Sequence, residues 1–208
     1  MQLHRRDVVD KATQLLDDYG IADLTMRRLA RELSVTPGAL YWHFADKQAL
    51  LGAVSDRILP PTTTSTVAHD RWADSVHAIC SGLRNALLST TDGAELVSAS
   101  FAAGKSEQMA EILQGLTNAA ADAGIDPSNA YLAARTVLYY VLGFTADEQS
   151  RLQWDAAGAL SENQSVMTTD PNGRFTFGLQ LLIDGIAARR LPGSGDHGVD
   201  PGVAVPAS

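Results

Sequence analysis

Apolar residues recur at helical spacing from the start of the chain. The first set falls at positions i, i+1, i+4, i+7, i+8 and i+11 and consists of Val8, Val9, Ala12, Leu15, Leu16 and Tyr19. This spacing predicts an amphipathic helix. Gly20 follows it, and we expect Gly20 to end the helix because glycine adopts a positive φ at the least cost.

Two short helices joined by a tight turn are predicted next. Thr25 is a typical N-cap residue for the first of them. Its apolar face consists of Leu29, Ala30 and Leu33. Thr36 followed by Pro37 is a strong start signal for the second, which we expect to run to about Phe44. A short helix pair behind a longer first helix is the arrangement of a helix-turn-helix, whose second member lies in the major groove of DNA.

A fourth helix is predicted after Asp46, which can cap it, and Pro60 and Pro61 end it because proline removes a backbone donor. Its apolar face consists of Leu50, Leu51, Val54 and Ile58. We expect this face to pack both on the preceding helices and on the rest of the chain. The fourth helix is then the only expected rigid link between the helix-turn-helix and the remainder.

Helical spacing also dominates the remainder, and no stretch alternates as a strand does. The predicted stretches are residues 72–87, 93–103, 109–120, 128–148 and 175–190. We therefore predict an all-α fold, with a three-helix helix-turn-helix domain followed by an antiparallel helical bundle that dimerises. The domains are expected at residues 1–58 (DNA binding) and 59–190 (ligand binding and dimerisation).

Three segments are predicted to be irregular. Residues 62–66 are threonine-rich and suit a linker. Residues 150–174 are polar and predict a long loop, with one helical turn around Trp154. Residues 191–208 contain seven glycines or prolines without an apolar face, which predicts a disordered tail.

The helix-turn-helix pattern leaves mostly small, aromatic and basic side chains for contact with DNA. The candidate residues are Thr25, Arg27, Arg28, Thr36, Pro37, Gly38, Ala39, Tyr41, Trp42, His43 and Lys47. Arg27 is the best candidate for a bidentate guanine contact, whereas Arg28 either binds phosphate or pairs with a nearby acid. Tyr41, Trp42, His43 and Lys47 can reach phosphates on either side of the groove. The alternative interpretation is that the aromatic residues form an ordinary core and the arginines a solvated face.

These residues resemble the DNA-binding domain of the tetracycline-repressor (TetR) family. The resemblance covers residues 5–55 and is carried by LTMRRLARELSV at 24–35, TPGALYWHF at 36–44 and DKQALL at 46–51. Weaker similarity to the tetracycline-repressor subgroup continues through Trp72 and Asp92 to the end. It implies an all-helical homodimer that releases double-stranded operator DNA when a small molecule binds the C-terminal domain. Ser34 departs from the family, which often has glycine at that turn.

The resemblance also implies an effector pocket, but the residues that bind magnesium-tetracycline do not carry over. Val97 replaces a metal-binding histidine and Ile79 an asparagine, so we expect a small, largely apolar, metal-free effector. The candidate ligand-binding residues are His77, Cys80, Leu83, Val97, Phe101, Met109, Leu113, Tyr139 and Trp154.

Charge and surface pattern refine this picture. Residues 1–58 hold eight basic and eight acidic residues, so the net charge of −8 belongs to the rest of the chain. An acidic bulk argues against a nonspecific architectural DNA protein. The predicted helices at 128–148 and 175–190 are apolar over most of their circumference, which predicts a four-helix bundle with a second copy. Residues that suggest this include Leu132, Leu138, Tyr139, Leu142, Phe175, Leu179, Leu182 and Ile186.

Other chemistry has weak support. His69, Asp70, Asp74 and His77 could contribute to a metal site, but a polar helix start explains them better, and no metal or cofactor is expected. Cys80 is the single cysteine and suits a buried apolar position. No catalytic constellation or signal peptide is visible, and we expect a soluble cytoplasmic protein without membrane contact. The alternatives are an all-helical enzyme and a constitutive DNA-binding protein without an effector.

Overall fold

The computed structural model describes residues 3–59, 72–159 and 170–189, and all the regular structure in these ranges is helical. The helices are α1 (Arg5–Tyr19), α2 (Met26–Glu32), α3 (Pro37–Tyr41), α4 (Lys47–Ile58), α5 (Trp72–Leu88), α6 (Gly93–Ala102), α7 (Glu107–Asp122), α8 (Pro127–Ala156) and α9 (Pro171–Ala187). The predicted all-α fold is confirmed. The linker at 62–66, the tail at 191–208, and His69 and Asp70 lie outside the described residues.

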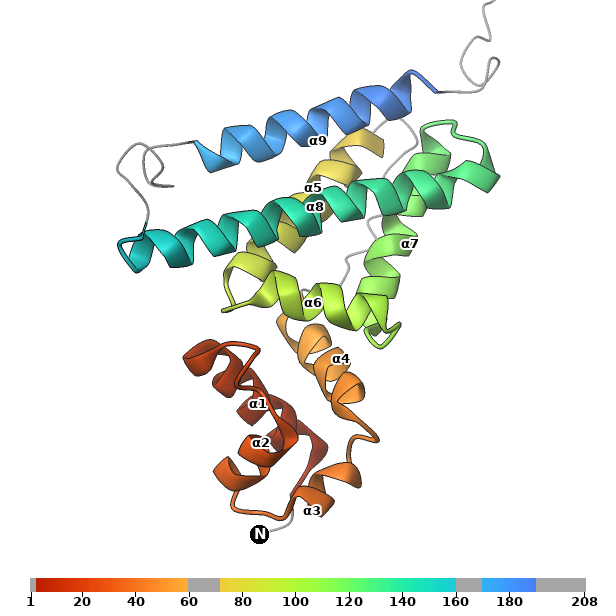
Figure 1. Ribbon diagram of the computed structural model, residues 1–208. Helices are drawn as coiled ribbons and strands as arrows, with labels where there is room; N and C mark the ends of the chain where they lie inside the picture. The colour runs from red at the N-terminus through yellow and green to blue at the C-terminus, as the bar shows by residue number, and fades with distance from the viewer. Residues whose placement is uncertain (1–2, 60–71, 160–169, 190–208) are drawn as a thin grey trace, which may run out of the picture.

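Helices α1–α4 form the lower part of the molecule in Figure 1. Their ends follow local chemistry: Gly20 ends α1 at φ +79°, and the Thr25 hydroxyl accepts a hydrogen bond from the Arg28 amide at 3.2 Å. The Asp46 carboxylate accepts one from the Ala49 amide at 2.7 Å. Leu40 and Phe44 are buried with the apolar faces of the other three helices. The predicted caps Thr25 and Asp46 and the helix order are confirmed. Thr36 lies at the N-cap position of α3 without a side-chain cap hydrogen bond, and α3 ends at Tyr41 rather than near Phe44.

Helices α5–α9 form the upper part, where α8 and α9 run in opposite directions, α5 crosses α8 and α6 lies below α8 (Figure 1). Contacts of α8 with α5, α6, α7 and α9 make it the centre of this domain. Its buried face includes Ala134, Leu138 and Val141. A continuous apolar core thus joins all five helices.

Two predicted loop segments are in fact helical. Helix α8 continues through 150–156, where a loop was predicted, because no glycine or proline interrupts it before Gly158, at φ +68°. Helix α9 begins at Pro171, four residues before the predicted start. The Asp170 carboxylate accepts a hydrogen bond from the Gly173 amide at 2.9 Å, so this end of the predicted loop is a helix cap. Residues 160–169 of the predicted loop lie outside the described residues.

The two parts meet at two places rather than at α4 alone. At the first, α4 lies on α6 and on the start of α7. At the second, the Asp92 carboxylate accepts a hydrogen bond from the Ile21 amide at 2.9 Å, and the Thr91 amide donates to Asp17 at 3.2 Å. The prediction that α4 is the only rigid link is therefore wrong. Asp92 could not be recognised from sequence because its backbone conformation, with φ +53°, directs its side chain away from its own helix.

Candidate nucleic-acid interface and effector core

Helix α3 presents an exposed, mostly uncharged surface. Thr36, Pro37 and Gly38 at its start are exposed, and Ala39 and His43 are half-buried. Tyr41 is 52% exposed and Trp42, which follows the helix, is 91% exposed. Large aromatic side chains rarely stand this far out of a protein surface unless they bind something. The alternative that Tyr41 and Trp42 are core residues is excluded by their exposure.

The turn before α3 depends on Ser34, which adopts φ +55°. The Val35 amide donates to the Ala30 carbonyl at 2.9 Å, which closes the end of α2 and turns the chain into α3. A non-glycine residue in this conformation costs about 1 kcal/mol. The departure at this turn is therefore tolerated without loss of the motif.

The two adjacent arginines at the start of α2 have different environments. Arg27 is exposed and makes no hydrogen bond or ion pair with the residues that the structure describes. Arg28 is half-buried, with Nη1 2.5 Å from the Asp23 carboxylate and its guanidinium 3.9 Å from the centre of the Tyr19 ring. Arg27 is thus available for a base, whereas Arg28 braces the turn between α1 and α2. Lys47, at the first turn of α4, is half-buried.

The candidate effector residues divide into a buried and an exposed group. Cys80, Leu83, Val97, Met109 and Leu113 come from α5, α6 and α7 and share one apolar core. Burial raises the pKa of the Cys80 thiol to about 12. His77 is half-buried, and its Nε2 lies 3.1 Å from Gln180 Oε1. The five apolar side chains of this core are all buried.

Tyr139 and Trp154 are more than half exposed and do not belong to that core. The Tyr139 hydroxyl accepts a hydrogen bond from Arg135, whose guanidinium also lies 5.4 Å from the centre of the half-buried Phe101 ring. Arg135 therefore contacts both Phe101 and Tyr139. Trp154 lies on the last turns of α8, separate from the other candidates, because that helix is longer than predicted.

An ion pair that no sequence pattern indicated lies inside the upper domain. Arg84 of α5 donates from Nε and Nη2 to the two carboxylate oxygens of Glu148 of α8, at 2.8 and 2.6 Å. Arg84 Nη1 also donates to Asn172 of α9 at 2.8 Å. The guanidinium stands 4.9 Å from the centre of the Phe175 ring. These contacts join three helices through one buried charge pair.

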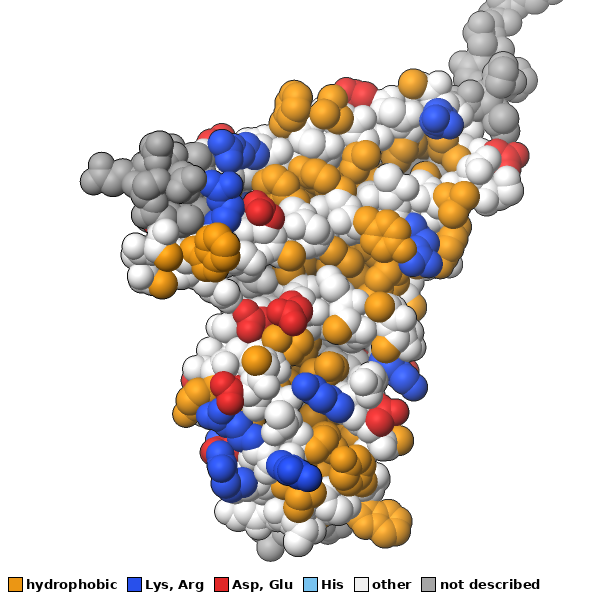
Figure 2. Space-filling model, viewed as in Figure 1, with side chains coloured by type: hydrophobic (Ala, Val, Ile, Leu, Met, Phe, Trp, Pro, Cys, Tyr) orange, Lys and Arg blue, Asp and Glu red, His pale blue; other side chains and the backbone are white. Residues whose placement is uncertain are grey.

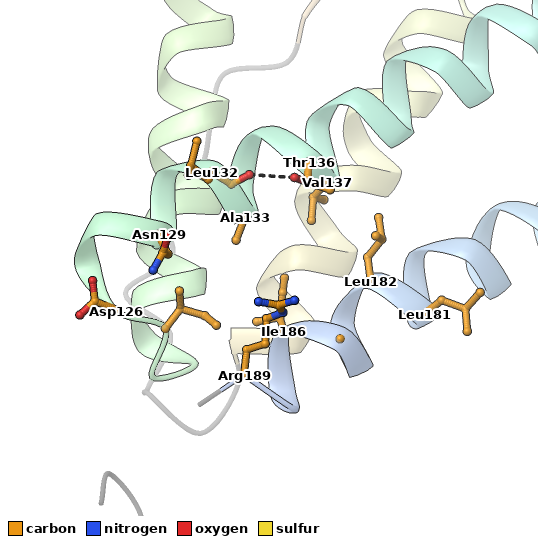
Figure 3. A pocket seen from close by; sticks show the side chains of 12 residues that line it. Asp126, Asn129, Leu132, Ala133, Thr136, Val137, Leu181, Leu182, Ile186 and Arg189 are labelled. Atoms are coloured by element: carbon orange, nitrogen blue, oxygen red, sulfur yellow. Dashed lines mark hydrogen bonds between the residues drawn. The ribbon is translucent and has the colours of Figure 1, made fainter. Parts of the chain in front are cut away.

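The residues that the structure describes border hollows on the upper domain and at its junction with the lower part. The first, of about 580 Å³, lies between the start of α8 and the end of α9 (Figure 3). Leu132, Ala133, Leu181 and Leu182 provide much of its wall, and Asp126 and Arg189 stand at one end. The second, of about 410 Å³, lies at the domain junction and is bordered by Asp17, Asp92, Gln149 and Gln153 among others. Neither coincides with the buried candidate residues.

Apolar side chains gather over α8 and α9 on the face shown in Figure 2. Leu132 and Tyr139 of α8 and Phe177 and Leu181 of α9 are all exposed. A Cβ added at Gly143 or Gly185 would meet nothing within 4 Å, so the backbone is accessible between these side chains. This combination of apolar and small residues suits close packing against another pair of helices.

No group of three His, Cys, Asp or Glu side chains converges as metal ligands within residues 3–59, 72–159 and 170–189. None of the helices in these ranges combines the length and apolarity needed to cross a bilayer.

A helix-turn-helix with an exposed recognition helix, attached to a helical domain with its own core, defines a DNA-binding regulator. The model for bacterial regulatory proteins of the tetR family matches residues 8–54, and the model for the tetracyclin repressor-like C-terminal domain matches residues 66–164. The chain belongs to the TetR family. As a member of this family it is a DNA-binding transcriptional repressor.

Similarity extends over nearly the whole chain. The tetracycline repressor protein class C of Escherichia coli is 31% identical, covering 91% of this chain and 93% of its own. The crystal structure of Mycobacterium smegmatis BioQ is 60% identical with a TM-score of 0.80, covering 90% of this chain and 99% of its own. A crystal structure of BioQ with its natural double-stranded DNA operator is 58% identical with a TM-score of 0.77 and the same coverage. These relatives are transcriptional regulators rather than enzymes.

Proposed function

We propose that residues 1–58 of each protomer read one half of a palindromic operator, and that residues 59–190 hold the effector and form the dimer. The observation that carries the first part is the exposure of α3 and of Trp42 beside it. The BioQ structure that contains operator DNA supports the same role here. Arg27 is assigned a base contact, whereas Tyr41, Trp42, His43 and Lys47 contact phosphates. Because bacterial operators lie in the cytoplasm, we place the protein there.

The effector is proposed to be small and largely apolar. Cys80, Leu83, Val97, Met109 and Leu113 offer dispersion contacts but few polar partners, and Val97 and Ile79 lack the donor atoms that a metal-chelated drug requires. Phe101 and Tyr139 border this core from the surface side through Arg135. Because these side chains are buried, an effector that contacts them has to displace them from one another.

The experiment is a footprint of the full chain on the DNA upstream of its own gene, with and without candidate small molecules. We expect protection of an inverted repeat, and loss of protection with the effector. Leu83→Trp is expected to abolish the response while leaving operator binding intact. Protection of an asymmetric site would contradict the dimeric mode, and protection insensitive to every apolar compound tested would favour a constitutive DNA-binding protein. Full response of Leu83→Trp would place the effector outside this core.

A further inference from the structure

The first turn of α7 is capped by a carboxylate from the other domain. Ser106 is the N-cap of α7, and its hydroxyl oxygen accepts a hydrogen bond from the Met109 amide at 3.1 Å. The same hydroxyl donates to Asp56 Oδ1 at 2.6 Å, and the Gln108 amide donates to that oxygen at 3.0 Å. Asp56 belongs to α4 and therefore supplies an acceptor that α7 cannot provide for itself. A carboxylate at this position is also favoured by the helix dipole.

The surrounding backbone leaves little room for α4 to slide. Ser55 is fully buried, and its hydroxyl donates to Ser106 at 3.3 Å. A Cβ added at Gly52 would lie 2.1 Å from the Lys105 carbonyl oxygen, so the two backbones are in direct contact. The absence of a side chain at Gly52 permits this close approach, which sets the separation of α4 and the start of α7. The Asp56 hydrogen bonds then fix how far one moves along the other.

This contact lies between the two functional parts of the chain. On one side, α7 carries Met109, Ile112 and Leu113 into the core that we assign to the effector. On the other side, α4 carries Leu50 and Val54 into the core of the DNA-binding domain at residues 1–58, called here the reading domain. A displacement of α7 is therefore passed to α4 through these contacts, in which one Asp56 carboxylate oxygen accepts hydrogen bonds from both Ser106 and the Gln108 amide. In a dimer, rotation of each reading domain changes the distance between the two α3 helices.

We propose that Asp56 is a positioning residue for operator recognition, holding the reading domain on α7 so that two α3 helices match one half-site spacing. The inference rests on the dimeric, palindromic mode proposed above. A positioning role for Asp56 differs from a purely stabilising role in one measurable respect. Loss of the contact impairs discrimination between spacings, whereas the affinity of one reading domain for one half-site is unaffected.

The test uses the full chain and the operator defined by footprinting. Affinity is measured at one salt concentration for that operator, for versions with one base pair added or removed between half-sites, and for an isolated half-site. Asp56→Ala is compared with Asp56→Asn, which keeps the acceptor oxygen, and with Asp10→Ala. Asp10 is a matched acidic control because it pairs with Arg6 and Arg57 within the reading domain. Circular dichroism confirms that each variant is folded.

We expect Asp56→Ala to lose about tenfold in affinity for the native operator, within the usual range of coupling between sites. Its preference for native over altered spacing should shrink by a similar factor, and its half-site affinity should equal that of the wild type. Asp56→Asn should recover most of the preference, and Asp10→Ala should retain all of it. An unchanged preference in Asp56→Ala, or an equal loss on the half-site, overturns the inference. A wild-type chain that binds the half-site as tightly as the operator overturns the dimeric mode itself.

Discussion

Arg84 and Glu148 face one another through two parallel hydrogen bonds, at 2.8 and 2.6 Å, and each side chain is only 7% exposed. The pair lies 64 residues apart in sequence and holds α5 on α8. Asn172 and Phe175 extend the contact to α9. The position of three helices therefore depends on the pair remaining complete.

Glu148→Ala should lower the free energy of unfolding by about 3 kcal/mol, because it leaves a buried guanidinium without its counter-charge. The double variant Arg84→Met with Glu148→Leu should recover most of this loss, since it removes both charges and retains volume. Urea denaturation monitored by circular dichroism measures both. A double variant as unstable as Glu148→Ala would show that packing, not the unpaired charge, causes the loss.

Asp92 combines two hydrogen bonds with backbone strain. Its carboxylate accepts from the Ile21 amide and from Gln153 Nε2 at 2.9 and 2.7 Å, and its φ is +53°. Asp92→Ala should lower the free energy of unfolding by about 2 kcal/mol. Asp92→Gly should lose about 1 kcal/mol less, because glycine relieves the left-handed conformation. Equal losses in a denaturant titration would show that this conformation stores no strain.

Arg27 and Arg28 provide a matched pair for the DNA interface. Arg27→Ala should weaken operator binding by about 1–3 kcal/mol and relax the preference at one base pair per half-site. Arg28→Ala should instead lower stability by about 1 kcal/mol, through loss of its contacts with Asp23 and Tyr19. Lys47→Ala should weaken all DNA sequences alike. Gel shifts on operator and scrambled duplexes distinguish these cases, and equal losses on both for Arg27→Ala would make Arg27 a phosphate contact.

Cys80 should be chemically inert in the folded protein. Burial raises its pKa from the ordinary 9.0 to about 12, so its thiolate is scarce at any physiological pH. A disulfide reagent at pH 8 should label it only after denaturation. The pKa of this thiol is 9.0 in the unfolded chain and about 12 in the folded protein. As the pH rises from 9.0 to about 12, the unfolded thiol has lost its proton while the folded thiol keeps it, so the stability of the folded state decreases over this range. Rapid labelling of the native protein would contradict the closed core.

The apolar face of α8 and α9 should be the dimer interface. Leu181 is 57% exposed there, and Leu181→Glu should give a monomer at micromolar concentration by light scattering. Operator affinity should fall with it. Leu152→Glu is the control, because Leu152 is also exposed on α8 but borders the hollow at the domain junction. A dimer that persists in Leu181→Glu but dissociates in Leu152→Glu would show that the dimer interface does not lie on this apolar face of α8 and α9.

Much of this molecule could be predicted where local chemistry decides the outcome. The cap residues Thr25 and Asp46, the stop at Gly20 and the exposed aromatic Trp42 all follow from short-range rules, and the structure contains each of them. The extension of α8 was missed because polar residues were interpreted as a loop. In the folded chain, Gln149 donates to the carbonyls of Leu87 and Thr90 at 2.9 and 2.8 Å, which gives that polar face a partner.

The domain junction could not be predicted for a different reason. Asp56 and Asp92 each cap or brace an element far away in sequence, and neither residue differs in type from the ordinary surface acids around it. The Arg84 to Glu148 pair is hidden in the same way, since a charged residue on a helix predicts exposure unless its partner is known. Contacts of this kind depend on how helices cross, which periodicity does not specify.

The 91% exposure of Trp42 gives the protein a built-in optical probe. An indole in water emits at longer wavelength than one inside a protein, and Trp72 is buried, whereas Trp154 is exposed at the end of α8. Contact with nucleic acid would change the surroundings of Trp42 alone among the three. Intrinsic fluorescence of the unlabelled chain would then report operator occupancy in real time, and Trp42→Phe would remove that signal while keeping the emission of the other two.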